Sequence, residues 1–147
     1  MIDRSHIGAT LTPYTVEVEK GALRFFAKAT GQSDALYVDE EVARAAGYAS
    51  LPVPPTFLFC LEMGGPNPNE MRQRLGVDIA RVLHGEQQFT YHAPVCAGAV
   101  LRFEPRVADI YAKKNGALEF IVRETRVLDQ QGALVAELRA VIVVRNN

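Results

Sequence analysis

The sequence predicts an α+β fold in a single domain of 147 residues. Three observations predict it. One short segment near the start alternates in polarity, the middle contains helical segments, and the last part contains four long segments rich in β-forming residues. A strand followed by helices and then by an antiparallel meander is an α+β pattern, and a chain of this length normally forms one domain.

The first strand is expected at 14–19, YTVEVE, where polar and apolar residues alternate. A helix is expected at 20–30, and a shorter one from 39 to 46, each ended by a glycine. The acidic residues that open the shorter helix favour its N-terminal dipole.

Prolines in 50–55 exclude helix from that segment. The next segment, 56–64 (TFLFCLEMG), is almost wholly apolar, and a helix that is apolar on all sides is expected to be buried. A further polar helical turn is expected at 69–75. Four phenylalanines at helical spacing are interpreted as core packing: Phe25, Phe26, Phe57 and Phe59.

The second half of the chain is expected to form four strands. Short links that contain glycine join them, so consecutive strands are expected to be antiparallel neighbours. The expected strands are Val82–Ala93, Val100–Lys113, Leu118–Leu128 and Leu134–Arg145.

Two stretches carry a resemblance to a known family. Residues 29–57, ATGQSDALYVDEEVARAAGYASLPVPPTF, resemble the signature of the MaoC-type, or (R)-specific, enoyl-thioester hydratases and dehydratases, T-G-D-x-N-P-x-H-x-D followed by an Ala-rich helix and a Gly-aromatic pair. Residues 83–101, LHGEQQFTYHAPVCAGAVL, resemble a strand and turn of the subfamily related to an N-terminal domain of MaoC proteins and to fatty-acid-synthase-like dehydratases. The matching residues of the first stretch are Thr30, Gly31, Asp39, Ala46, Gly47 and Tyr48.

The likeness covers roughly Val16 to Val144 and implies a single hotdog domain, in which a curved sheet wraps one central helix, here 56–64. It also implies an acyl thioester, on CoA or on a carrier protein, as ligand, and no metal ion or cofactor. A single sheet of this kind leaves an edge strand uncovered, so a hotdog dimer is expected, either a homodimer or a heterodimer with a catalytic MaoC-like subunit.

The chain departs from the signature at the two positions that carry the family's chemistry. Gln32 stands where the family has its catalytic Asp, and Tyr37 where it has His. An amide is not a usable base, and a phenol holds its proton at neutral pH. Family members that lack the pair often form one half of a heterodimer or of a double-hotdog chain, so the resemblance implies a partner that carries the Asp and His.

Other residues are candidates for the missing roles. Asp34 is a candidate displaced carboxylate, with an Asx turn as the alternative, and Asp39 is a candidate acid, with a helix N-cap as the alternative. Pro55 and Thr56, at the start of the central helix, are candidate substrate-binding residues. So is Cys60, for which core packing is the alternative.

Alternation with period two divides the segment 82–93 into two faces. One face is expected to lie against the central helix and contains Leu83, Phe89 and Tyr91. The opposite face is expected to contain His84, Glu86, Gln88, Thr90 and His92. His92 is expected to be an ordinary surface residue on a polar face that is exposed to solvent. His84 and the neighbouring Gly85 are candidates for a substrate site or a dimer interface, because the subfamily motif carries a His there.

The composition of the chain argues against several classes of function. A net charge of −1 does not favour binding to nucleic acid. No apolar run approaches the ~20 residues of a membrane span, and the N-terminus does not read as a secretory signal. Two cysteines, Cys60 and Cys96, lack metal-ligand spacing. A cytoplasmic protein is expected.

The leading hypothesis is an acyl-thioester-binding subunit of an enoyl-thioester hydratase or 3-hydroxyacyl dehydratase that needs a catalytic partner. One alternative is a self-sufficient homodimeric enoyl-CoA hydratase that uses Asp34 or His84. Others are a non-enzymatic acyl-CoA-binding protein and, more remotely, a thioesterase, since fold does not determine function.

Overall fold

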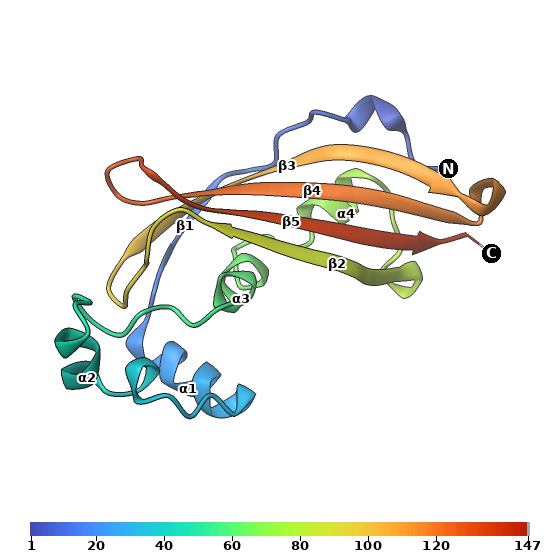
Figure 1. Ribbon diagram of the computed structural model, residues 1–147. Coiled ribbons are helices and arrows are strands. Elements are labelled where there is room, and N and C mark those ends of the chain that lie inside the picture. Colours follow the sequence, from blue (N-terminus) through green and yellow to red (C-terminus); the bar gives the residue numbers. More distant parts are fainter. Residues whose placement is uncertain (147) are drawn as a thin grey trace.

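The computed structural model of the protein describes residues 1–146 and is built on one antiparallel sheet (Figure 1). Its five strands lie in the order β1-β3-β4-β5-β2, and every neighbouring pair is antiparallel. The α+β prediction is confirmed. The strands are β1 (Tyr14–Glu17), β2 (Val82–Tyr91), β3 (Val100–Lys113), β4 (Leu118–Leu128) and β5 (Leu134–Arg145).

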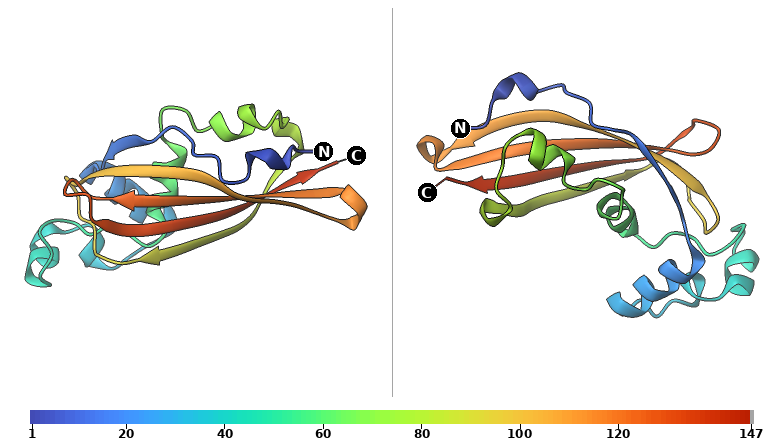
Figure 2. Two further views of the ribbon diagram at one scale, coloured as in Figure 1. Left: turned by 90° about the horizontal axis from the view of Figure 1, so that it is seen from above. Right: turned by 180° about the vertical axis from the view of Figure 1, so that it is seen from behind.

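The helices lie on one side of this sheet, with α3 closest to it and α1 and α2 beyond one end (Figures 1 and 2). They are α1 (Lys20–Thr30), α2 (Glu40–Ala45), α3 (Phe57–Met63) and α4 (Glu70–Arg74), and 3₁₀ turns occur at η1 (Arg4–His6), η2 (Ala35–Tyr37), η3 (Ile79–Arg81) and η4 (Lys114–Gly116). Within residues 1–146, no helix has both the length and the apolar character needed to cross a bilayer.

Local sequence signals explain where the first helices begin and end. Gly31 ends α1 in the left-handed conformation, with a φ of 70° that favours glycine. Asp39 caps α2, since its carboxylate accepts the backbone N–H of Glu41 at 2.8 Å. Together these two boundaries position the loop that connects α1 to α2, which contains Gln32 and Tyr37.

Two apolar clusters fill the space between the sheet and the helices. One joins α3 to one end of the strands and includes Phe57, Leu58, Leu61, Phe103, Val127 and Leu138. The other joins α4 and the N-terminal segment to the opposite end and includes Leu11, Met71, Val107, Ile110, Ile121 and Ile142.

A buried polar group lies between the two clusters. Along β4, Arg123 and Thr125 occupy the positions between Ile121 of one cluster and Val127 of the other. The carboxylate of Glu62, on α3, is only 3% exposed; it lies 2.6 Å from Nη2 of Arg123 and accepts a hydrogen bond from the hydroxyl of Thr125. The described apolar core is therefore interrupted by an ion pair.

The prediction that α3 is buried on all sides is wrong. Phe57, Leu58, Leu61 and Glu62 are buried, but Met63 is 45% exposed and Cys60 lies on the exposed face. The reason is geometric: a single sheet covers only one face of the helix. The core interpretation of Phe25 is also wrong, because this α1 side chain is 74% exposed.

Candidate functional site

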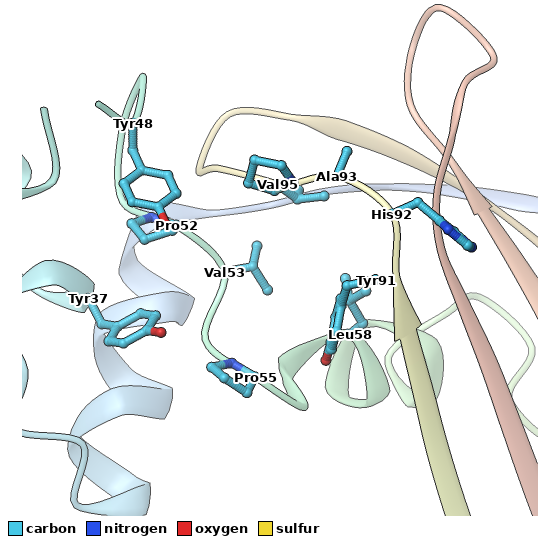
Figure 3. Close-up of a pocket in the computed structure, with 11 residues that line it drawn as sticks. Tyr37, Tyr48, Pro52, Val53, Pro55, Leu58, Tyr91, His92, Ala93 and Val95 are labelled. Carbon is cyan, nitrogen blue, oxygen red and sulfur yellow. The ribbon is translucent and has the colours of Figure 1, made fainter. Parts of the chain in front are cut away.

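A cavity of about 340 Å³ lies between the helical layer and the sheet (Figure 3). Its wall combines the loop before α3, the start of α3 itself and the segment that follows β2. Three phenols, from Tyr37, Tyr48 and Tyr91, supply polar groups to a wall that is otherwise mainly apolar. The remaining lining residues are Pro52, Val53, Pro55, Leu58, His92, Ala93, Pro94 and Val95.

The two positions that depart from the signature lie beside this cavity. Tyr37, at the end of η2, lines it directly. Gln32 lines an adjoining hollow together with Pro55 and Thr56. The amide oxygen of Gln32 accepts the backbone N–H of Asp34 at 3.1 Å, so the side chain braces its own loop. The α1–α2 loop thus abuts a cavity at the start of α3.

Both candidate carboxylates serve as caps in this structure. The carboxylate of Asp34 accepts the backbone N–H of Leu36 at 3.0 Å and caps η2, which is the geometry of the Asx-turn alternative. Asp39 caps α2 in the same way. Neither residue is among those that line the cavity.

Thr56 immediately precedes α3 and has an unusual backbone conformation. Its φ is 73°, in the left-handed region that a threonine rarely adopts. Its backbone N–H donates to the hydroxyl of Tyr91 at 3.0 Å. The start of α3 is thereby tied to the end of β2, beside the cavity.

A β-bulge in β2 overturns the faces predicted for the residues that precede it. The pairing register with β5 shifts between His84 and Glu86, which leaves Gly85 as the extra residue. The shift places His84 on the side of α3, where its ring lies 5.3 Å from that of Phe59, and not beside Glu86. Leu83, predicted to face the helix, is 48% exposed. Phe89 does pack against the α3 cluster, as predicted.

Gly85 has a packing reason to be glycine. A Cβ atom at this position would lie 2.9 Å from Cγ2 of Val143 and 3.0 Å from the carbonyl oxygen of Val141. Glycine lets the bulged strand lie against β5, so the role of Gly85 in this structure is to set the direction of His84.

His92 points away from the cavity in Figure 3, although it is one of the residues around it. One of its ring nitrogens lies 2.8 Å from the carboxylate of Glu137, and both side chains are well exposed. This agrees with the expected polar outer face.

A second cavity, of about 240 Å³, lies along the other half of α3, and His84 is one of its lining residues. Its wall is mostly apolar and includes Phe59, Met63, Met71, Val82, Ile121 and Ile142. Arg123 also lines it. Cys60, a candidate for contact with substrate, lines neither of the two cavities.

Two features of the site were not predicted from the sequence: the ion pair between Glu62 and Arg123, and the place of Tyr48 in the first cavity. One signal was available for the pair. Glu62 is the single charged residue in the apolar segment 56–64, and a buried charge requires a partner. No comparable signal distinguishes Arg123 from the other arginines of β4 and β5.

The same polar group shifts the titration of Tyr14. Burial raises the pKa of the Tyr14 hydroxyl well above its ordinary value of 10.0, and the negative charge of Glu62 raises it further. The hydroxyl donates to the backbone carbonyl of Glu62 at 3.0 Å, and the ring stacks on Phe103. Tyr14 is therefore a structural hydrogen-bond donor that links β1 to α3.

Comparison with known proteins identifies the family of this chain. Residues 5–138 match the family described as FAS1-like, dehydratase domain region. The chain belongs to this family. The match spans the whole sheet except the end of β5, together with all the helices described above, so the membership applies to the domain as a whole.

One relative of this FAS1-like dehydratase-region chain is a UPF0336 protein of Saccharopolyspora erythraea. The two are 34% identical over 145 residues, which cover 98% of this chain and 92% of the relative.

Solved structures show that the FAS1-like dehydratase-region chain has the hotdog fold expected for the family. The C-terminally truncated HadBC (3R-hydroxyacyl-ACP dehydratase) complex of Mycobacterium tuberculosis matches with a TM-score of 0.73 and 24% identity, over 89% of this chain and 91% of that chain. The ChsH1–ChsH2 complex of the same organism matches with a TM-score of 0.75 and 22% identity, over 94% and 89%.

Proposed function

We propose that this chain is the acyl-thioester-binding subunit of an enoyl-thioester hydratase or 3-hydroxyacyl dehydratase, with a second hotdog chain supplying the acid and base. The observation that carries the proposal is the combination of a cavity at the start of α3 with Gln32 and Tyr37 in the loop beside it. In this proposal the loop corresponds to the one that carries the family's proton-transfer groups, and Gln32 and Tyr37 replace those groups.

The chemistry explains why a partner is needed. Adding water to an enoyl thioester requires a base for the water, a proton donor at Cα and hydrogen bonds to the thioester carbonyl. The amide of Gln32 orients water but does not accept its proton. Asp34 is occupied as a cap. Proton transfer is therefore assigned to the partner, and binding to this chain.

The surface beside β2 supports an interface for that partner. β2 is an edge strand, with β5 as its one neighbour in the sheet. Three large apolar side chains near this edge are exposed: Met63 by 45%, Ile79 by 61% and Leu83 by 48%. An edge strand flanked by exposed apolar residues is a surface that proteins cover. HadBC and ChsH1–ChsH2 are each named as complexes.

The second cavity supports the assignment of an acyl ligand. Its apolar wall along α3 fits a hydrocarbon chain, and it begins at the same helix whose N-terminal end borders the first cavity. A thioester head in the first cavity and an acyl tail in the second would both be positioned by α3. The two unpaired thiols, Cys60 and Cys96, fit the reducing cytoplasm in which such metabolism occurs.

The decisive experiment is co-purification of the tagged chain from its native host, followed by hydration of crotonyl-CoA by the isolated chain and by the complex. We expect a second hotdog chain with an intact Asp/His loop, activity in the complex and none in the isolated chain. Leu83→Glu should release the partner, whereas Val42→Glu, at a site of similar exposure on α2, should not. Full turnover by the isolated chain would reject the proposal.

A self-sufficient hydratase is the second candidate, and one observation favours it. The bulge at Gly85 turns the ring of His84 toward α3 and the second cavity, where an imidazole has the chemistry of a general base. Activity of the isolated chain that is lost in His84→Ala would support this candidate. If acyl-CoA raises the melting temperature and no product forms with any partner, the chain is a binding protein only.

A further inference from the structure

A row of apolar side chains crosses the face of the sheet that points away from the helices. Tyr111 of β3 pairs with Phe120 of β4, which pairs in turn with Val143 of β5. Val143 also pairs with Leu83 on the edge strand β2. In β3, β4 and β5 the adjacent isoleucine belongs to the core cluster on the helical side, so these four side chains lie on the opposite face. We call them the outer row.

Charged side chains flank the outer row, with cations on one side and acids on the other. Along β3, alternation places Asp109, Tyr111 and Lys113 on the same face, so a carboxylate and an ammonium group lie on either side of the row. Lys113 and Arg145 are paired with the same residue of β4 and therefore share one side. Asp109 and Glu86 lie on the other side. Nζ of Lys113 also lies over the ring of Tyr111, 5.6 Å from its centre.

These four charged groups form no ion pair among residues 1–146. The other half of the same face is different, because its charges pair with one another. Arg106 lies 2.7 Å from Glu124, and Arg126 lies 3.3 Å from Glu104. One half of the outer face thus satisfies its own charges, whereas the half that carries the outer row leaves them available to a partner.

The arrangement around the outer row is complementary to its own rotated image. A rotation of 180° about an axis that runs along the row brings a second copy face to face with the first and exchanges the two sides of the row. Lys113 of each copy then lies opposite Asp109 of the other, because both residues are two positions from Tyr111. The apolar row packs on itself. A two-fold contact of this kind uses the same patch on both subunits, and sheets commonly pack face to face with their strands aligned.

We propose that the outer row binds a second copy of this chain, sheet against sheet, with reciprocal ion pairs between Lys113 and Asp109. Charge complementarity selects this partner, because a surface of one sign would match only one side of the row. The two cavities lie on the helical side of the sheet, so the contact leaves them free. The inference goes beyond the proposed function and does not depend on the acyl ligand.

Charge reversal on β3 tests the contact and leaves the β2 edge unchanged. Lys113→Asp places carboxylates opposite each other at the contact, and Asp109→Lys places ammonium groups there. Like charges that face each other across an interface are strongly disfavoured, so each variant should raise the dissociation constant between copies at least about tenfold. Light scattering on a dilution series of the purified chain, with any partner that co-purifies, measures the copies per particle. This number should halve in each variant.

A mixture of the two variants gives the decisive result. A Lys113→Asp copy that faces an Asp109→Lys copy regains both ion pairs with their signs exchanged, so the mixture should return to the wild-type mass. A folding defect in either variant would not be repaired in this way. Arg102→Glu, outside the patch on the same face of β3, is the matched control and should keep the wild-type mass. If a reversed variant does not fold, Tyr111→Lys places two cations on the axis and should also halve the number.

Three results would overturn the inference. They are a wild-type particle with one copy of this chain at every concentration, variants that keep the wild-type mass, and a mixture that stays dissociated. Each of these leaves the proposed function intact, because hydration of crotonyl-CoA is measured separately. Absence of that activity from every complex would instead reject the proposed function without affecting the contact.

Discussion

The carboxylate of Glu62 lies 2.6 Å from the guanidinium of Arg123, although the two residues are 61 positions apart in the chain. One belongs to α3 and the other to β4, and their side chains are only 3% and 11% exposed. The pair lies where the two apolar clusters of the core meet. It ties the central helix to the middle of the sheet at one register.

The first prediction concerns this pair. Glu62→Ala should lower the free energy of unfolding by about 3–5 kcal/mol, because it leaves the charge of Arg123 buried and uncompensated. The double variant Glu62→Leu/Arg123→Met should recover most of the loss, since well-packed apolar pairs often replace buried ion pairs without cost. Urea unfolding measures both.

A matched control comes from the outer face of the sheet. Arg106 and Glu124 lie 2.7 Å apart, but they are 57% and 38% exposed. Glu124→Ala should therefore cost less than about 1 kcal/mol. Equal losses in Glu62→Ala and Glu124→Ala would show that burial does not set the strength of these pairs.

The second prediction concerns Glu119 and acid stability. Burial tends to raise the pKa of its carboxyl, but hydrogen bonds from Asn146 at 2.6 Å and from the backbone N–H of Ile2 at 2.7 Å outweigh burial and lower the pKa below its ordinary value of 4.5. The unfolded chain then binds this proton more readily than the native chain. The contribution is complete above the unfolded pKa and is lost as pH falls through the lowered native pKa.

Urea unfolding at a series of pH values checks this prediction. In Glu119→Gln, the free energy of unfolding should be lower at neutral pH and should fall less steeply on acidification than in the wild type. A wild-type and a variant curve that run parallel down to about pH 3 would contradict the assigned role of Glu119.

The third prediction concerns the bulge in β2. Gly85→Ala should destabilise the protein by about 1–3 kcal/mol, because the added Cβ overlaps Val143 and the backbone of Val141. Gly21→Ala is the matched control: a Cβ there meets no atom within 4 Å, and alanine favours helix, so stability should rise by up to about 1 kcal/mol. Thermal unfolding distinguishes the opposite signs.

The fourth prediction restores the family's chemistry. Gln32→Asp combined with Tyr37→His places an acid and a base in the loop beside the first cavity. Acid–base groups contribute about 10²–10⁴-fold to such reactions, so the isolated double variant should hydrate crotonyl-CoA at least about tenfold faster than the uncatalysed reaction, whereas the isolated wild-type chain should not exceed that background. Absorbance of the enoyl thioester follows the reaction. Gln32→Asn, which adds no base, should remain at the wild-type rate.

Local patterns were sufficient to predict most elements. The structure has β3, β4, β5 and α1 with the predicted bounds, and α3 begins one residue after the predicted start. Alternation, glycine turns and helix caps each involve residues a few positions apart, so the sequence itself contains the information. The position of Tyr37 beside a cavity also followed from its loop, once the resemblance had indicated where that loop lies.

Other features depend on contacts between distant segments. The direction of His84 reversed because the register between β2 and β5 shifts at Gly85, and a register is a property of two strands together. The exposure of Cys60 follows from how much of α3 one sheet covers. Short-range patterns in the sequence were enough to predict most elements, and they identified Gln32 and Tyr37 as the two positions at which the chain departs from the family signature. The tertiary structure decided which side chains meet, because burial and pairing arise only when segments far apart in the chain pack together.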